Sequence, residues 1–314
     1  MSSIAFMFPG QGSQAIGMGV ALAGAFPVAR AVFEEVDHAL DQHLFRLMRE
    51  GPEDELTLTR NAQPALMAVS VAATRALEHM VGRPLGSIGG AALGHSLGEW
   101  SALVATGAFS LEVGARLLRR RGEAMQAAVP VGAGAMAAIL GLELAAVQKL
   151  CAEAAAGDVV AAANDNGGGQ VVISGTADAV ARAVQLAPSH GAKRAIPLNV
   201  SAPFHCALMQ PAADAMAQAL AETTILEPSL PIITNVRAAP TRDPDEIREL
   251  LVAQVTGTVR WRECVAVLPD LGIGRVIEAG AGKVLQGLAK RIVKDLETLP
   301  LGTPEEAEAV AKSL

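Results

Sequence analysis

The stretch Gly94–Gly98, with the sequence Gly-His-Ser-Leu-Gly, restricts the possible folds of this chain more than any other feature. A short apolar run, Ala91–Leu93, leads into it, and an amphipathic helical run follows it and ends at Gly107. A serine at the apex of a strand, a sharp turn and a helix forms a nucleophile elbow. Glycines on both sides allow strand and helix to pack closely, so that the Ser96 hydroxyl projects into open space. The alternative is a glycine-rich turn in which Ser96 only caps the helix, and the flanking runs favour the nucleophile.

The composition indicates a globular interior and argues against a nucleic-acid partner. The 314 residues are enough for one large α/β domain, or for one with a smaller insert. Hydrophobic residues make up 51% of the chain and aromatic residues only 3%, so a surface that stacks on bases is not expected. The net charge of −7 gives no general attraction to phosphate backbones. An acidic partner would therefore have to dock on a local basic patch.

The chain carries no targeting or membrane signal, and we expect a cytoplasmic protein. Met1–Phe8 is too short for a secretory signal and runs directly into a Pro-Gly turn. No uninterrupted apolar run approaches the roughly 20 residues that a membrane-spanning helix needs. The cysteines Cys151, Cys206 and Cys264 are far apart and odd in number, so the sequence predicts neither a disulfide framework nor a metal site.

The N-terminal segment offers a second candidate for catalysis. Ile4–Phe8 is predicted as a buried strand that ends in the turn Pro9–Gln14. Glycines on both sides of Gln11 leave its backbone N–H free to face a ligand, as an oxyanion hole requires. The other interpretation is an ordinary strand-to-helix turn with a polar cap.

Helical periodicity dominates the first 130 residues. The spacing predicts helices over 21–50, 59–80 and 111–126, with Pro64 expected to kink or open the second of them. The third carries Arg119, Arg120 and Arg121 in succession. Three consecutive helix positions fan out over about 200°, so at most one or two of these arginines can face a cleft. Spacing leaves open which of them does.

Residues 131–200 change rhythm and predict a small inserted domain. The pattern gives strand, helix, two strands, helix and strand, at 135–140, 144–155, 159–163, 170–174, 178–190 and 195–198. This βαββαβ order is that of the ferredoxin-like unit. Residues 1–130 and 201–314 then form one discontinuous α/β domain, with further elements at 207–220, 231–236, 243–254, 275–278 and 284–296. We therefore expect a large α/β-hydrolase-like domain with a mostly parallel sheet and an inserted ferredoxin-like domain.

A serine nucleophile needs a base, and His205 is the best candidate. It follows a strand and precedes a helix, which is where open α/β sheets present functional groups. His95 is adjacent to Ser96 on a tight turn, so its ring is poorly placed to bond the hydroxyl, and His190 ends a surface-like helix. A helix-capping role remains the alternative for His205.

Four ordered motifs resemble those of the malonyl-coenzyme A:acyl carrier protein transacylases. They are Phe8–Gln14, Gly94–Glu99, Arg121-Gly122 with Met125-Gln126, and Pro203–His205. The resemblance covers nearly the whole chain and extends to Gln254 and the loop at 280–283. Four motifs in order at family-like separations are far more specific than the elbow alone.

The resemblance implies an acyltransferase, an acyl-carrier-protein S-malonyltransferase that works through a serine. In such an enzyme Ser96 would attack the malonyl thioester, and His205 would take its proton and later activate the second thiol. The backbone N–H groups of Gln11 and Leu97 would hold the developing oxyanion. The carbonyl of Gln254 would orient the histidine, with no acidic third member.

The resemblance also implies the substrates. Arg121 would pair with the free carboxylate of malonate through two parallel hydrogen bonds, which a lysine cannot form as well. Phe204 and Met125 are expected to set acyl selectivity, with Phe204 excluding a methyl branch; the alternative for Phe204 is ordinary core packing. We expect malonyl-CoA as donor, holo-acyl carrier protein as acceptor, and no cofactor beyond the coenzyme A thioester. The expected enzyme is a monomer that supplies fatty acid synthesis.

Other functions remain open at this point. A serine esterase needs an Asp or Glu between serine and histidine, and the candidates Asp158, Asp165 and Asp178 all fall in the predicted small domain. An acyltransferase of polyketide or malonate-decarboxylase systems would use the same catalytic residues with another carrier. A scaffold that only binds a carrier has no need for a serine, a histidine and an arginine together.

Basic pairs offer a docking site for an acidic carrier protein. Lys193-Arg194 and Lys290-Arg291 lie near the predicted rim of the cleft. Their alternative role is that of solvated surface charges.

Overall fold

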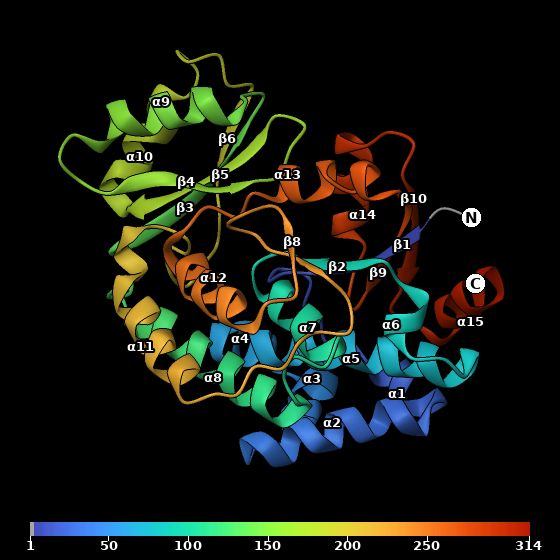
Figure 1. Ribbon diagram of the computed structural model, residues 1–314. Coiled ribbons are helices and arrows are strands. Elements are labelled where there is room, and N and C mark those ends of the chain that lie inside the picture. The colour runs from blue at the N-terminus through green and yellow to red at the C-terminus, as the bar shows by residue number, and fades with distance from the viewer. Residues whose placement is uncertain (1–2) are drawn as a thin grey trace.

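The computed structural model describes residues 3–314 and contains two separate sheets (Figure 1). The first has six strands in the order β10-β9-β1-β2-β7-β8, and only β7 and β8 pair antiparallel. Its strands are β1 (Ser3–Phe8), β2 (Ala91–Gly94), β7 (Ile232–Ile233), β8 (Pro240–Thr241), β9 (Ile273–Ala279) and β10 (Glu297–Leu301). The prediction of a mostly parallel sheet is therefore confirmed.

The central strand β1 is covered on both faces, which is the reason it is apolar throughout its buried length. Successive side chains of a strand point to opposite faces. Phe6 and Phe8 accordingly join the large core cluster on one face, whereas Ala5 and Met7 join a second cluster with Trp261 on the other. Strands buried in this way read as continuous hydrophobic runs.

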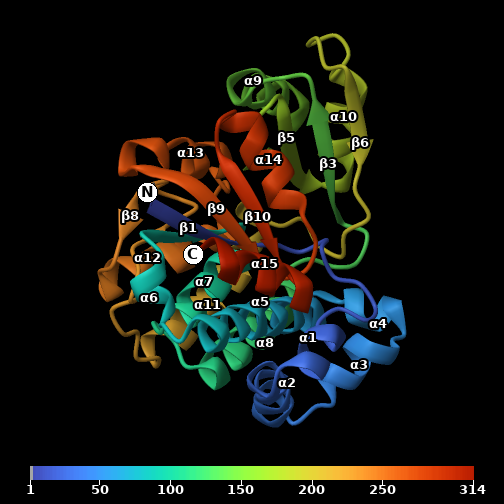
Figure 2. The same ribbon diagram turned by 90° about the vertical axis from the view of Figure 1, so that its right-hand side faces the viewer.

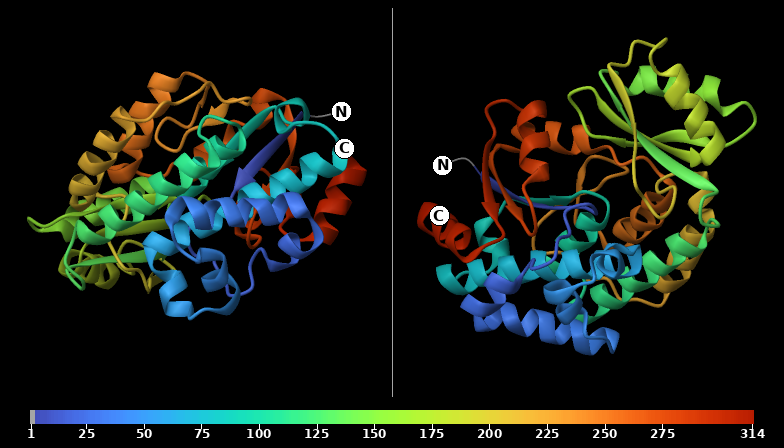
Figure 3. Two further views of the ribbon diagram at one scale, coloured as in Figure 1. Left: turned by 90° about the horizontal axis from the view of Figure 1, so that it is seen from below. Right: turned by 180° about the vertical axis from the view of Figure 1, so that it is seen from behind.

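Helices form a thick layer on one face of this sheet and a thin layer on the other (Figures 2 and 3). The thick layer and its surroundings contain α1 (Val20–Ala25), α2 (Pro27–Leu40), α3 (Leu44–Glu50), α4 (Glu53–Thr57), α5 (Thr59–Val81), α6 (Leu85–Ile88), α7 (Leu97–Ala105), α8 (Leu111–Ala127), the 3-10 turn η1 (Ala207–Met209), α11 (Gln210–Ala221), α12 (Pro244–Thr256) and α15 (Pro304–Ser313). The thin layer contains α13 (Trp261–Ala266), the 3-10 turn η2 (Pro269–Leu271) and α14 (Val284–Ile292).

Two of the predicted helices needed correction. The segment 21–50 forms three helices, because Pro27 starts a new helix after Phe26 and Asp41 adopts a left-handed backbone with φ of 46°. The helix at 59–80 is not opened at Pro64, since α5 continues through it to Val81. Proline lacks the N–H that would bond the carbonyl of Arg60, and Arg119 Nε donates to that carbonyl instead at 2.9 Å.

The second sheet confirms the predicted βαββαβ order. Its elements are β3 (Gly134–Leu140), α9 (Leu144–Ala155), β4 (Val160–Asp165), β5 (Gln170–Thr176), α10 (Ala177–Leu186) and β6 (Arg194–Pro197). The strands pair antiparallel in the order β4-β5-β3-β6, and the two helices share a core of their own with one face of the sheet. The helix predicted to reach His190 ends at Leu186, close before Pro188, where proline disfavours the helical conformation of its predecessor.

Strand β4 of the second sheet is hydrogen-bonded to the segment that follows α12. Val259, which follows α12, makes a parallel bridge to β4: its N–H donates to Ala163 O and its carbonyl accepts from Asp165 N, both at 2.9 Å. The buried carboxylate of Asp165 pairs with Arg262 Nε at 2.8 Å. These bonds hold the β4–β5 hairpin beside the carboxyl edge of the parallel sheet. No helix in the described residues is both long and apolar enough to cross a bilayer.

Candidate active site

The predicted elbow is present, and its geometry explains its glycines. Strand β2 leads into Ser96, whose backbone has φ of 53° and ψ of −109°, and α7 begins at the next residue. A Cβ at Gly94 would lie 2.0 Å from the Gly98 carbonyl carbon, and a Cβ at Gly98 would lie 2.1 Å from Phe8 O. Neither position can carry a side chain without moving backbone. A strained serine held in this way is a feature of functional sites.

His205 is the partner of the serine hydroxyl. Its Nε2 lies 2.8 Å from Ser96 Oγ, and its Nδ1 lies 2.8 Å from the main-chain carbonyl of Gln254. Because a carbonyl can only accept, Nδ1 carries the proton and Nε2 presents its lone pair to the serine. These two hydrogen bonds meet the geometry that a nucleophile and its general base require.

The other histidines and the acidic residues considered from the sequence lie elsewhere. His95 Nε2 is 3.0 Å from Asn166 Oδ1 in the β4–β5 hairpin, so it points away from the serine hydroxyl. Of the aspartates that an esterase triad could use, Asp158 pairs with Arg182 and Asp165 pairs with Arg262. The third position of a triad is filled here by a carbonyl oxygen, which argues against the esterase.

Burial of His205 keeps its ring neutral. The side chain is 4% exposed, and burial first, then the positive charge of Arg121, lower its pKa to about 3. The free base is thus available at neutral and mildly acidic pH. The folded protein binds fewer protons than the unfolded chain between the ordinary value of 6.5 and this pKa, so this group removes stability as the pH falls through that window.

We expect the imidazole nitrogen-15 signals of His205 to stay those of a neutral ring between about pH 5 and 8, whereas an ordinary histidine titrates near 6.5. Nuclear magnetic resonance of histidine-labelled protein measures this, and His205→Asn assigns the signal by its loss. A titration of that signal with a midpoint near 6.5 would contradict the expectation.

Arg121 completes the cluster. Its Nη2 lies 3.1 Å from Ser96 Oγ and 3.0 Å from Gln254 Oε1, while its Nη1 donates to Gln63 Oε1 at 2.7 Å. The side chain is 2% exposed, its Nε has no hydrogen-bond partner, and no ion pair of the described residues includes it. Burial lowers its pKa to about 10, against the opposing charge of Glu99, so the group stays cationic. A buried guanidinium without a carboxylate is suited to an anionic ligand.

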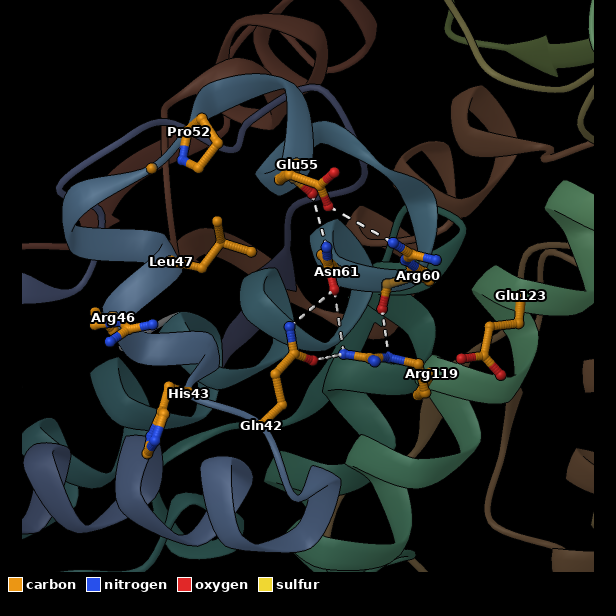
Figure 4. A pocket seen from close by; sticks show the side chains of 11 residues that line it. Gln42, His43, Arg46, Leu47, Pro52, Glu55, Arg60, Asn61, Arg119 and Glu123 are labelled. Atoms are coloured by element: carbon orange, nitrogen blue, oxygen red, sulfur yellow. Dashed lines mark hydrogen bonds and ion pairs between the residues drawn. The ribbon is translucent and has the colours of Figure 1, made fainter.

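The three consecutive arginines of α8 thus point in different directions. Arg120 is exposed, and Arg119 donates to the Arg60 carbonyl and to Asn61 Oδ1. Arg119 lines a cavity of about 430 Å³, whose side chains are drawn in Figure 4. The residues that line it are Gln42, His43, Arg46, Leu47, Gly51, Pro52, Glu55, Arg60, Asn61, Arg119 and Glu123. Neither Ser96 nor Arg121 lines this cavity, so only Arg121 belongs to the serine site.

The two predicted oxyanion donors lie on either side of the elbow. Leu97 begins α7, and the Gln11 loop packs on the elbow closely enough that a Cβ at Gly10 would lie 2.8 Å from His95 O. Within residues 3–314, neither Leu97 N nor Gln11 N has a main-chain hydrogen-bond partner. The side chain of Gln11 is tied down through Nε2 to Thr59 Oγ1 at 3.2 Å. Both donors are therefore available to a ligand.

The two predicted selectivity residues border the same cluster. Met125 is buried, and its sulfur lies 3.8 Å from Nε2 of Gln63, the residue that bonds Arg121. Phe204 is half-buried and precedes His205 in the chain. It packs against the large core cluster of the parallel sheet and against the small cluster on the second sheet.

Sequence reasoning missed the polar residues beneath the elbow. Asn235 Oδ1 accepts from Ser96 N and its Nδ2 donates to Gly94 O, both at 2.7 Å. Its own N–H donates to Glu99 Oε2 at 2.9 Å, and burial raises the pKa of Glu99 to about 7. A signal existed for Asn235, because it follows β7, the parallel neighbour of β2, at the sheet edge where functional groups gather.

Comparison with known proteins agrees with this geometry. The acyl transferase domain family matches residues 5–308, and the chain is 44% identical over 309 residues to the malonyl CoA-acyl carrier protein transacylase of Escherichia coli strain K12, covering 98% of this chain and 99% of that protein. The chain belongs to this transacylase family. The resemblance carried by the four motifs is thereby confirmed.

Solved structures of the transacylase family superpose over nearly the whole chain. The acyl-carrier-protein-S-malonyltransferase of Bartonella henselae is 54% identical with a TM-score of 0.97, and 99% of each chain is covered. A malonyl-transacylase in complex with a type II PKS acyl-carrier protein is 42% identical with a TM-score of 0.96, and both chains are covered fully. The family thus includes a structure with its carrier in place.

Proposed function

We propose that this protein transfers the malonyl group from malonyl-CoA to the phosphopantetheine thiol of holo-acyl carrier protein and so supplies fatty acid synthesis. The observation that carries the proposal is the buried guanidinium of Arg121, 3.1 Å from Ser96 Oγ and without a carboxylate of its own. The relatives at 44% identity bear the name of this activity.

The first half-reaction loads the serine. His205 Nε2 takes the proton of Ser96 Oγ as the oxygen attacks the thioester carbonyl, and the N–H groups of Gln11 and Leu97 bind the oxyanion. The carbon–sulfur bond then breaks, and coenzyme A leaves as the thiol with the proton that His205 held. Malonyl-Ser96 remains.

The second half-reaction reverses these roles. The pantetheine thiol gives its proton to His205 Nε2 and attacks the acyl-serine carbonyl, and the oxygen of Ser96 leaves with that proton. The Gln254 carbonyl keeps Nδ1 protonated throughout, so the same nitrogen serves as base and acid. Each carrier meets the enzyme in turn, which is a ping-pong mechanism. The balanced steps call for no metal and no cofactor beyond the thioester.

The acyl group is selected at its carboxylate and at its α-carbon. Arg121 binds the carboxylate, and an acetyl group would leave that guanidinium unpaired. Phe204, beside the base, and Met125, beneath Gln63, would close the pocket around the α-carbon and so disfavour a methyl branch.

We further propose the domain and solution properties that go with this function. Residues 1–130 and 201–314 form an α/β-hydrolase-like catalytic domain, of which residues 1 and 2 lie outside the described part, and residues 131–200 form a ferredoxin-like domain. The strand orders of the two sheets support this division. The protein would act in the cytoplasm as a monomer.

Mass spectrometry after mixing with malonyl-CoA tests the function. A malonyl adduct on Ser96 that disappears on addition of holo-acyl carrier protein is the expected result. A polyketide carrier is a second candidate acceptor, favoured by the neighbour solved with such a carrier, and rates with both carriers distinguish them. An adduct that water removes as fast as the carrier does would overturn transfer in favour of hydrolysis.

One member of each predicted basic pair lies close to the turn between β4 and β5, which supports a docking surface. Lys193 packs against Gly141, whose N–H bonds Gly169 O in the β4–β5 turn at 2.7 Å. Arg291, on α14, lies against Gly168 in the same turn and donates to Gln170 Oε1 at 3.4 Å. An exposed cation next to β6 and another on α14 therefore lie near the same turn, which suits an acidic carrier.

Reversing both charges of the α14 pair, Lys290→Glu with Arg291→Glu, is expected to raise KM for holo-acyl carrier protein by about tenfold, because like charges then meet across the surface. KM for malonyl-CoA should change less than about twofold. Steady-state kinetics at low salt measures both, with Lys312→Glu on α15 as the charge-reversal control. Equal effects on the two substrates would remove the docking role.

A further inference from the structure

We propose that Glu99 is a positioning residue for acyl selection: through the side-chain amide of Gln254, it holds the guanidinium of Arg121 in the orientation that receives a carboxylate. The inference rests on the proposed function. Glu99 lies in the first turn of α7, below the elbow, and is 1% exposed. Hydrogen bonds from Asn235 and Gln254, and after them the positive charge of Arg121, oppose the effect of burial and favour the charged form of this carboxylate.

Glu99 decides which way the Gln254 amide faces. Glu99 Oε2 accepts from Gln254 Nε2 at 2.8 Å and from the Asn235 N–H at 2.9 Å. On the same side, the carbonyl of Ser96 accepts from Gln254 Nε2 at 3.1 Å. The carboxylate and the carbonyl are both acceptors, so only the NH2 end of the amide fits there. A flipped amide would place its oxygen against two oxygens.

The other end of the amide meets only donors. Gln254 Oε1 accepts from Arg121 Nη2 at 3.0 Å and from Trp100 Nε1 at 3.3 Å. Acceptors on one side and donors on the other therefore specify the orientation of the amide. Trp100 is also close to the guanidinium, whose carbon lies 5.9 Å from its ring centre.

Two fixed acceptors then hold the plane of the guanidinium. Gln254 Oε1 binds Nη2 and Gln63 Oε1 binds Nη1, while the buried Nε is left without a partner. Without Glu99, the side-chain amide of Gln254 could rotate. Arg121 would then lose the acceptor that fixes its guanidinium, or would face the NH2 group of the amide instead of its oxygen. Binding of a carboxylate depends on this orientation, whereas an acetyl group makes no use of it. Loss of Glu99 should thus reduce malonyl transfer more than acetyl transfer.

Glu99→Met tests the proposal, because it keeps the length of the side chain and removes the acceptor. In competition between equimolar malonyl-CoA and acetyl-CoA, the ratio of malonyl to acetyl adducts on Ser96 is expected to fall about tenfold, the size of one charge-assisted hydrogen bond. Glu99→Gln retains an acceptor oxygen and should keep the ratio within about twofold of the original.

A matched control separates this role from general damage to the core. Glu278 is also fully buried and accepts from two main-chain N–H groups, those of Leu285 and Gln286, both at 3.0 Å. Glu278→Met should lower stability and leave the adduct ratio unchanged. Equal losses of malonyl and acetyl transfer in Glu99→Met would overturn the proposal, because they indicate a structural role only.

The route through Gln254 has its own test. Gln254→Ala keeps the main-chain carbonyl for His205 and removes the amide, so it should lower the ratio by about the same factor, and adding Glu99→Met to it should change the ratio less than about twofold. A full second loss in the double variant would overturn the route. If Glu99→Met does not fold, Gln254→Ala alone tests the proposal. An unchanged malonyl-to-acetyl ratio in Gln254→Ala would contradict the role of its amide in orienting Arg121. Absence of any malonyl adduct in the original protein would instead refute the proposed function.

Discussion

Ser96→Ala is expected to lower malonyl transfer by about 10⁴-fold or more and to abolish the covalent adduct, because it removes the only atom to which the acyl group is attached. His205 and Arg121 stay in place in this variant, so binding of malonyl-CoA should survive. Rapid mixing with malonyl-CoA, followed by mass spectrometry of the intact protein, measures the adduct. Steady-state transfer to holo-acyl carrier protein measures the rate.

A serine remote from the cluster provides the control. Ser87 is exposed within the short helix α6, where its hydroxyl donates to the Pro84 carbonyl, so Ser87→Ala should load malonate at the original rate. If Ser96→Ala still forms an adduct, the nucleophile is another residue and the mechanism is wrong. If it retains full transfer without an adduct, the acyl group passes directly between thiols.

Arg121→Ala is expected to lower malonyl loading by about 10²- to 10³-fold and to leave acetyl loading within about a few-fold of its original value. The estimate follows from the cost of removing one partner of a buried, hydrogen-bonded charge pair. Arg121→Lys should restore little, since an ammonium group cannot bond Gln63, Gln254 and a carboxylate in one plane. The ratio of kcat/KM for malonyl-CoA and acetyl-CoA is the quantity to measure.

Arg119→Ala is the matched control, because Arg119 lies two positions away on α8 and faces the separate cavity. Its malonyl preference should equal that of the original protein. A comparable loss of preference in both arginine variants would mean that α8 as a whole, and not one guanidinium, sets the selectivity.

Local patterns predicted the parts of the fold and site that are local. Three features could be predicted because each occupies a short stretch of sequence: the elbow, the Gln11 turn and the βαββαβ unit. Glycines indicate the two turns, and the periodicity of apolar residues indicates the strands and helices. The helix breaks near Pro27 and Asp41 were missed, because the apolar spacing continues across them. The strand predicted at 231–236 is shorter in the structure, where β7 spans only Ile232–Ile233 and pairs with β2 through two residue pairs.

The polar network under the serine could not be predicted from local patterns. Glu99 meets Asn235 and Gln254 across 136 and 155 positions of sequence, and both contacts exist only because α12 and the end of β7 pack beside α7. Nothing in a single chain marks such a pair as neighbours. The choice among the three consecutive arginines was undecidable for the same reason, as it depends on how α8 is rotated against α5.

One contact between α8 and α5 follows from the backbone N–H that Pro64 lacks. Pro64 leaves the Arg60 carbonyl free, and Arg119 from α8 occupies it. Gly122 lets the two helices touch at the same level, since a Cβ there would lie 2.6 Å from the Arg60 Cα. The hydrogen bond that proline cannot make in one helix thus gives the neighbouring helix a fixed contact, two positions from Arg121, the residue proposed to select the acyl group.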